Sequence, residues 1–180
     1  MVANVYVPLN ASKGLEVLDA VALRAQQYRK AGYAVVVAVD LNAHVAGGED
    51  RPLDAHGTPV PGICSRAVRV GERVNWFGTS VLDRCHTAGL VLLTGRGAQC
   101  ESPQAVLDSY VRENGRSRPD HVLVSLDMAG WIVSHTVQPG MHGLSDHLPL
   151  VVALRVPACA TAAASDAQPQ AQGPLPRRLL

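Results

Sequence analysis

The sequence is poor in aromatic residues and has almost no net charge. Aromatic residues make up 4% of the chain, so little supports a surface that stacks on single-stranded bases. Lys and Arg number 16 against 15 Asp and Glu, which gives a formal charge of +1. That balance excludes a polybasic coat that binds nucleic acid through bulk charge, although it leaves a local basic patch open.

Long apolar runs and paired cysteines are also missing. No apolar run approaches the ~20 residues that cross a bilayer, and the first segment, MVANVYVPLN, lacks the basic and apolar regions of a secretory signal. We therefore expect a soluble, intracellular protein without membrane contact. The four cysteines are widely spaced with no CxxC pair, which argues against a disulfide framework or a thiolate zinc site and favours buried thiols.

The chain does contain apolar strands that alternate with amphipathic helices. With 180 residues and 47% hydrophobic residues, it is long enough for one domain with its own core. Apolar spacing predicts a helix with Ser12 as its N-cap and Gly32 just after its C-terminal end, and a second helix that follows Asn75 and ends at Gly89. Strands are predicted at residues 4–7, 33–39, 90–93, 105–111, 120–125, 131–137 and 148–156.

The predicted organisation is one α/β domain with a mixed sheet over residues 1–156. The turn signal Asn114-Gly115 predicts that strands 105–111 and 120–125 pair as an antiparallel hairpin with a long loop. Residues 157–180 are rich in Ala, Gln and Pro without apolar periodicity, so we expect a disordered tail there.

Polar side chains follow the buried strand 33–39. Asp40 and Asn42 lie two residues apart, so on a strand they would share a face and point into one cleft. Asp40 could hold a hard cation or orient a water molecule, and Asn42 offers an acceptor and two donors to a phosphate oxygen. The alternative is an ordinary turn, because Asp and Asn are common after strands.

A second polar group, Ser145-Asp146-His147, precedes the apolar run 148–154. It sets an imidazole, which titrates near neutrality, beside a carboxylate. Adjacent residues face opposite ways on a regular strand, so both reach one site only from a loop or bulge. Asp120 could accept the ring N–H of an imidazole and fix its orientation. Each signal has a plain alternative as a polar turn, but their joint occurrence at strand edges favours a shared site.

Four segments carry a resemblance to a known family. NVYVP, VVVAVDLNAH, RPDHVLVS and LSDHLPLVVAL resemble, in order and approximate spacing, the endonuclease/exonuclease/phosphatase superfamily, also called DNase I-like. That superfamily includes apurinic endonucleases, inositol polyphosphate phosphatases and the endonuclease domains of non-LTR retrotransposons. The segment 75–96 is most similar to the retrotransposon branch. The resemblance covers residues 2–156 and implies the C-terminal portion of a four-layer α/β/β/α sandwich with largely antiparallel mixed sheets.

The resemblance also implies a chemistry and a set of roles. The reaction would be hydrolysis of a phosphodiester, with DNA as the substrate and Mg²⁺ or Mn²⁺ as the cofactor. In the family pattern, Asp40 and Asn42 would orient the attacking water and contact the phosphate, and Tyr6 would also contact the phosphate. Asp146 would bind the metal ion. His147 would bind the scissile phosphate, and Asp120 would hold the His147 ring in place.

One departure from the family pattern changes the expected activity. The family carries an Asn and a metal-binding Glu upstream of the Tyr-x-Pro strand, whereas Tyr6 lies five residues after Met1. We therefore expect weak or absent catalysis by this chain alone, with an N-terminal half or a neighbouring reverse transcriptase encoded elsewhere as a partner. A retroelement origin would imply action in the nucleus. A phosphatase or lipid phosphodiesterase of the same fold, and a catalytically dead binding module, remain open alternatives.

Two groups of arginines could hold the DNA backbone on either side of the cleft. Their alternative is a set of solvated loop arginines, because Glu72 and Glu113 lie nearby. The two groups are Arg66, Arg69 and Arg73, and Arg112, Arg116 and Arg118. The trio His135, His142 and His147 matches no familiar zinc spacing, which favours ordinary hydrogen-bonded histidines.

Overall fold

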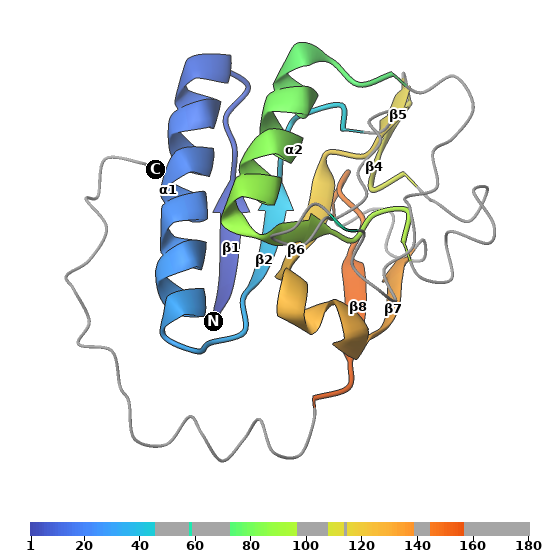
Figure 1. The fold of residues 1–180 in the computed structure, drawn as a ribbon. Coiled ribbons are helices and arrows are strands. Elements are labelled where there is room, and N and C mark those ends of the chain that lie inside the picture. The colour runs from blue at the N-terminus through green and yellow to red at the C-terminus, as the bar shows by residue number, and fades with distance from the viewer. Residues whose placement is uncertain (46–57, 59–72, 97–107, 114, 139–144, 157–180) are drawn as a thin grey trace.

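The computed structural model describes residues 1–45, 58, 73–96, 108–113, 115–138 and 145–156. Helices and strands alternate in the first half, and strands dominate the second (Figure 1), which confirms the α/β class. The elements are β1 (Val2–Tyr6), α1 (Ala11–Lys30), β2 (Val36–Asp40), α2 (Trp76–Ala88), β3 (Leu90–Leu92), β4 (Tyr110–Arg112), β5 (Gly115–Ser117), β6 (Asp120–Ser125), the 3₁₀ helix η2 (Leu126–Trp131), β7 (Ile132–Val137) and β8 (Leu150–Leu154).

A mixed four-stranded sheet forms the centre, in the order β1-β2-β6-β3. Strands β1 and β2 are parallel, and α1 makes the crossover that a parallel pair requires. Strand β6 runs antiparallel to both β2 and β3. In this register Tyr6 lies beside Asp40, and Asp40 lies opposite Asp120. The pairing therefore brings three of the predicted site residues into one row at the end of the sheet.

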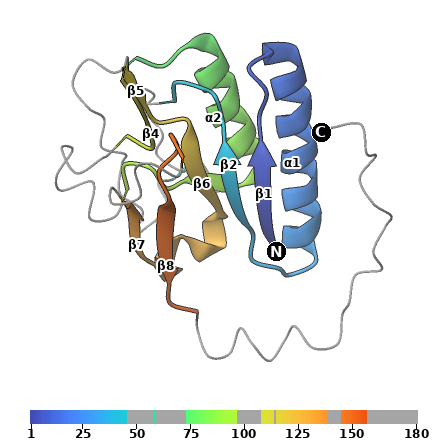
Figure 2. The ribbon, with the colours of Figure 1, turned by 180° about the vertical axis from the view of Figure 1, so that it is seen from behind.

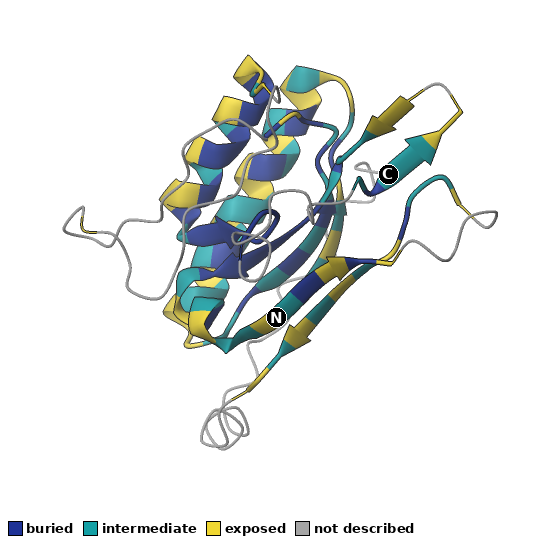
Figure 3. Cartoon of the chain, turned by 90° about the vertical axis from the view of Figure 1, so that its right-hand side faces the viewer, coloured by how far each residue is buried: buried dark blue, intermediate teal, exposed yellow. Residues whose placement is uncertain are grey.

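Both helices cover the same face of this sheet, as the opposite views of Figures 1 and 2 show. Their apolar residues, among them Leu18 and Val81, form one core with the inward side chains Val37 and Val39 of β2. Along both helices buried residues face the sheet and exposed residues face outward (Figure 3). One-sided burial of this kind is what the helical apolar spacing predicts.

The ends of the helices agree with the predicted signals at three of four positions. Asn75 caps α2 by accepting a hydrogen bond from the Gly78 amide, and Gly89 ends it with φ of 63°. Gly32 follows α1 with φ of 82°. The predicted cap Ser12 is wrong: Asn10 caps α1, because its carboxamide oxygen accepts from the Lys13 amide and the helix begins at Ala11.

The opposite face of the sheet carries the antiparallel pair β7–β8. Val91, Val122, Val124 and Met128 form a second core there, and partly buried residues of β7 and β8 pack against it. The described residues thus build a helix layer, a central sheet and a pair of strands beyond it. Over β1 this face is open, since Val2 is 82% exposed and Tyr6 62% exposed.

The predicted hairpin between residues 105–111 and 120–125 is wrong. The short strands β4 and β5, on either side of residue 114, pair with each other, and Asn114 itself lies outside the described residues. Strand β6 instead lies between β2 and β3. Its residues from His121 to Ser125 are all buried, so it needs neighbours on both edges and cover on both faces, which a surface hairpin cannot supply.

Several predictions fall partly or wholly outside the described residues. The tail 157–180 and the domain boundary at residue 156 stay predictions, as do the states of Cys64, Cys100 and Cys159. Cys85 is buried, as predicted for it. In the described part of the chain, neither helix is both long enough and apolar enough to cross a bilayer.

Candidate functional site

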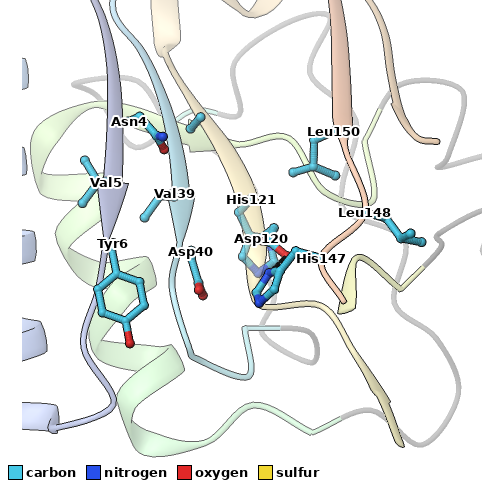
Figure 4. A pocket seen from close by; sticks show the side chains of 11 residues that line it. Asn4, Val5, Tyr6, Val39, Asp40, Asp120, His121, His147, Leu148 and Leu150 are labelled. Carbon is cyan, nitrogen blue, oxygen red and sulfur yellow. Dashed lines mark hydrogen bonds and ion pairs between the residues drawn. The ribbon is translucent and has the colours of Figure 1, made fainter. Parts of the chain in front are cut away.

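The candidate site lies where β1 and β2 end and β6 begins. Figure 4 shows Tyr6, Asp40, Asp120 and His147 gathered around one pocket at this edge. Asp40 and Asp120 are directly opposite each other in the antiparallel pair, so their side chains lie on the same face. His147 arrives from a different part of the chain, on the segment that leads into β8.

Asp120 and His147 form a hydrogen-bonded pair. The Nδ1 atom of His147 lies 2.8 Å from Oδ2 of Asp120, and the two side chains are 37% and 17% exposed. A carboxylate only accepts, so this contact puts a proton on Nδ1 and leaves Nε2 for another partner. The carboxylate also fixes the direction of the ring, which an isolated surface histidine lacks.

Asp40 completes a group of three that could hold a metal ion. One ligand atom from each of Asp40, Asp120 and His147 lies within 4.8 Å of the other two, and all three residues are half-buried. Two carboxylates with one imidazole suit a hard or borderline dication, and Mg²⁺ is commonly held by one or two protein carboxylates. The residues present therefore fit such an ion.

The electrostatics at Asp40 also favour a positive partner. Burial raises the pKa of the Asp40 carboxyl above its usual value of 3.8, and the neighbouring charge of Asp120 raises it further. The Asn42 amide and the charge on His147 act in the opposite direction without cancelling this rise. A cation between Asp40 and Asp120 would offset the cost of two facing carboxylates.

Asn42 lies beside this group and is not among the residues that line the pocket. Its backbone has φ of 47°, a conformation that Asn tolerates better than most residues, and its amide donates to Oδ1 of Asp40 at 3.1 Å. Its side-chain nitrogen donates to the carbonyl of Val7 at 2.9 Å. Asn42 therefore ties the end of β1 to the loop after β2, and its side-chain oxygen is the group left to contact a ligand.

Asp146 is held by β4. Its Oδ2 atom accepts from Nε of Arg112 at 2.7 Å and from Nη2 at 2.6 Å. The hydrogen bonds from Arg112 lower the pKa of Asp146, and those to Asp146 raise the pKa of the guanidinium. The Asp146 carboxylate is thus paired with Arg112 and does not belong to the group formed by Asp40, Asp120 and His147.

The pocket itself has a volume of about 600 Å³. Its wall combines the polar residues at the sheet edge with the open face of β1 and β2 and the start of β8. It is lined by Asn4, Val5, Tyr6, Ala38, Val39, Asp40, Asp120, His121, His147, Leu148 and Leu150. Tyr6, Asp40, Asp120 and His147 were predicted from the sequence, whereas Asn42 and Asp146 do not belong to this wall.

Comparison with solved structures identifies the architecture. The chain is similar to the endonuclease domain of TRAS1, a telomere-specific non-LTR retrotransposon (TM-score 0.53, 16% identity), over 84% of this chain and 55% of that one. It is similar to an AP endonuclease from Archaeoglobus fulgidus (TM-score 0.57, 15% identity) over 86% of this chain and 62% of that one. It is also similar to the 3'-5' exonuclease NExo from Neisseria meningitidis (TM-score 0.55, 15% identity) over 83% of this chain and 56% of that one. The chain has the DNase I-like fold.

This DNase I-like chain spans 55–62% of the length of those three neighbours. No family model matches the sequence, and no curated protein matches it either. The identities of 15–16% establish a shared architecture, so the chemistry has to be argued from the residues of the pocket.

The sequence did not predict some of the residues that line this pocket or lie beside it. His121 lines it although its ring points to Thr94, with 2.8 Å between Nδ1 and the threonine Oγ1. Arg112 was expected either to contact the DNA backbone or to be a solvated loop arginine, and no role was predicted for Tyr110. Arg73, Arg112 and Arg116 are exposed and Arg118 is half-buried, while Arg66 and Arg69 lie outside the described residues. A run of Tyr and Arg on one short strand beside a polar tripeptide gave no recognisable signal.

Proposed function

We propose that this chain is the core of a metal-dependent phosphodiester hydrolase that acts on DNA. The observation that carries the proposal is the Asp120–His147 hydrogen bond, set within 4.8 Å of Asp40 in a pocket of a DNase I-like fold. A carboxylate, an oriented imidazole and a second carboxylate are the groups that in-line attack on a phosphorus atom needs. The three structural neighbours named above are an endonuclease domain, an AP endonuclease and an exonuclease, which supports DNA as the substrate.

Each residue has a role that follows from its contacts. His147 keeps Nδ1 on Asp120 and offers Nε2 to a phosphate oxygen, where its hydrogen bond strengthens as negative charge builds up in the transition state. The second oxygen of Asp40 and the side-chain oxygen of Asn42 are acceptors that orient the attacking water. Tyr6, at the pocket wall, offers its hydroxyl to the phosphate.

Mg²⁺ or Mn²⁺, held by carboxylate oxygens of Asp40 and Asp120, would supply Lewis-acid charge to the phosphoryl oxygens. The role of Asp146 as a metal ligand stays a prediction from the family resemblance, because its carboxylate contacts Arg112 in the structure.

We also propose that the chain alone is a weak catalyst and works with a complementary half of the fold. The match leaves 38–45% of the length of each neighbour without a counterpart in this chain, and the face over β1 is open, with Val2 82% exposed. The remainder of such a fold, joined to this chain or separate, would cover that face and add ligands to the metal. The likeness to the TRAS1 domain supports the retroelement type. A neighbouring reverse transcriptase and action in the nucleus stay expectations that would follow from that type.

A plasmid-nicking assay tests the proposal. Supercoiled plasmid is incubated with the chain in Mg²⁺ or in EDTA, and conversion to the open circle is measured for the wild type and for His147→Ala. His44→Ala is the matched control, because His44 is an exposed histidine outside the pocket wall. We expect nicking in Mg²⁺ that EDTA and His147→Ala abolish and His44→Ala preserves. Equal nicking in all samples would refute a hydrolase site at His147.

A second candidate is a phosphatase or lipid phosphodiesterase of the same fold. It is favoured by the composition of the site, whose polar residues are suited to a phosphate and include no group committed to a nucleobase. A structure of NExo in the same fold is described as a 3' phosphatase, which shows that related architectures serve phosphomonoesters. Release of phosphate from inositol phosphates without plasmid nicking would select this candidate. Binding of DNA with no turnover of either substrate would indicate a binding module.

A further inference from the structure

We propose that β4, together with Ser109 before it, is the element that positions the Asp120–His147 pair, with Tyr110 and Arg112 as positioning residues. The inference rests on the proposed function for its catalytic consequence, but its structural part can be tested in the resting protein. It assigns a task to a short strand that, among the strands of the described residues, pairs only with β5.

The backbone of β4 holds the segment that carries His147. The Val111 amide donates to the carbonyl of Asp146 at 2.9 Å, and the Leu148 amide donates to the carbonyl of Ser109 at 2.6 Å. Between these two bonds, Tyr110 and His147 form an antiparallel bridge. Residues 146–148 are therefore aligned on β4 at three successive positions, although they lie more than thirty residues away in the chain.

Ser109 connects the same strand to the other partner of the pair. Its hydroxyl accepts a hydrogen bond from the Asp120 amide at 3.2 Å, and the residue is 1% exposed. Ser109 thus accepts hydrogen bonds from two backbone amides, that of Leu148, which follows His147, and that of Asp120. This double attachment sets the spacing between two residues that come from distant parts of the sequence.

Side chains of β4 fix the ring itself. The Tyr110 and His147 rings meet edge to face, with centroids 5.0 Å apart and an angle of 69° between their planes. The imidazole is therefore held by Asp120 through Nδ1 and by Tyr110 through its ring. Edge-to-face pairs contribute about 0.5–1.5 kcal/mol beyond the area they bury, enough to favour one ring orientation over others.

Arg112 holds Tyr110 and Asp146 together. Its guanidinium carbon lies 5.1 Å from the centre of the Tyr110 ring, and its nitrogens contact the Asp146 carboxylate. The Arg112 side chain is 66% exposed, so solvent screens this ion pair and its contribution to folding is small. Its consequence is geometric: it keeps the ring of Tyr110 and the backbone before His147 in one arrangement.

The activity test compares Tyr110→Leu, Tyr110→Phe, Arg112→Ala and the control Arg155→Ala, an exposed arginine that lies outside the pocket wall and belongs to neither predicted DNA-contacting group. We expect Tyr110→Leu to lower kcat by about 10- to 100-fold with KM within about twofold, because misplacing a reacting group costs rate more than binding. Tyr110→Phe keeps the ring and should retain wild-type kcat. Arg112→Ala should lower kcat by about tenfold, and Arg155→Ala should not.

A measurement without substrate separates this inference from the proposed function. Proton NMR of the resting protein should show the Nδ1–H signal of His147 protected from exchange in the wild type and in Tyr110→Phe, and lost or broadened in Tyr110→Leu. If no variant, nor the wild type, turns over DNA, the NMR result still decides whether β4 positions His147. A Tyr110→Leu protein that stays folded and keeps both the signal and kcat would overturn the inference, as would a rise in KM at constant kcat, which indicates a substrate contact instead.

Discussion

Replacing Asp120 by Asn tests the pair on which the site is built. The substitution keeps the shape of the side chain and removes the charge that faces Nδ1 of His147 at 2.8 Å. A hydrogen bond to a charged group contributes about 1.5–3 kcal/mol, which corresponds to about 10- to 150-fold in rate if it is needed in the transition state. Because His147 is 37% exposed, water screens part of this energy, and we expect the lower part of that range, about 10- to 50-fold.

The assay is kcat/KM for cleavage of an end-labelled duplex, measured over a range of Mg²⁺ concentrations. Asp120 is also a candidate metal ligand, so the metal titration separates its two roles. A loss of rate that persists at saturating Mg²⁺ reflects the orientation of His147, and a loss that excess Mg²⁺ restores reflects metal binding. Asp127→Asn is the control, since Asp127 is an exposed carboxylate that pairs with Arg29. Activity of Asp120→Asn within about threefold of the wild type at all Mg²⁺ concentrations would refute the reasoning.

Three further predictions concern stability. Burial raises the pKa of Asp40 in the folded state above its usual value of 3.8. At pH values between these two pKa values, the folded state keeps a proton that the unfolded state has lost, so the free energy of unfolding falls as the pH rises through this interval. Asp40→Asn should remove that fall and give a higher Tm than the wild type at pH 7 without metal; an unchanged pH profile would contradict this. Adding Mg²⁺ at about 100 times its Kd should stabilise the wild type by about 2.7 kcal/mol, seen as a rise in Tm, and should leave Asp40→Asn unchanged; an equal rise in both proteins would place the ion elsewhere. Gly78→Ala should destabilise by about 1–3 kcal/mol in urea unfolding, because the new Cβ would lie 2.0 Å from the His44 carbonyl oxygen. Gly130→Ala, with nothing within 4 Å of its Cβ, is the control, and equal costs would contradict the account.

The sequence was most informative where a local pattern has one physical outcome. Helix α2 begins after Asn75 and ends at Gly89, as predicted. The Asn cap and the left-handed Gly provide hydrogen bonds for the free N–H and C=O groups at the ends of the helix, and these bonds involve only residues close in the sequence. Asp40 ends a buried strand as its position after the run 33–39 indicates. The approach of Asp120 to His147 was anticipated from an imidazole and a carboxylate at two strand edges, together with the family resemblance.

Long-range pairing was beyond the same reasoning. The Asn114-Gly115 signal is local, and the strands that pair on either side of residue 114 are β4 and β5, so the signal carried no information on where β6 pairs. The apolar run Val122–Val124 could have indicated an interior strand, because it is buried on both faces. The contact between Arg112 and Asp146 joins residues 34 apart through a register that only the folded chain sets.

Locating a bound metal ion tests the central claim most directly. Crystals of the chain grown with Mn²⁺ and a short DNA duplex would give an anomalous signal that marks the ion without reference to activity. The account predicts one Mn²⁺ between the carboxylates of Asp40 and Asp120, with a backbone phosphate within hydrogen-bonding distance of Nε2 of His147. A manganese ion bound away from these carboxylates, or DNA seated on another surface while this pocket holds neither, would contradict it.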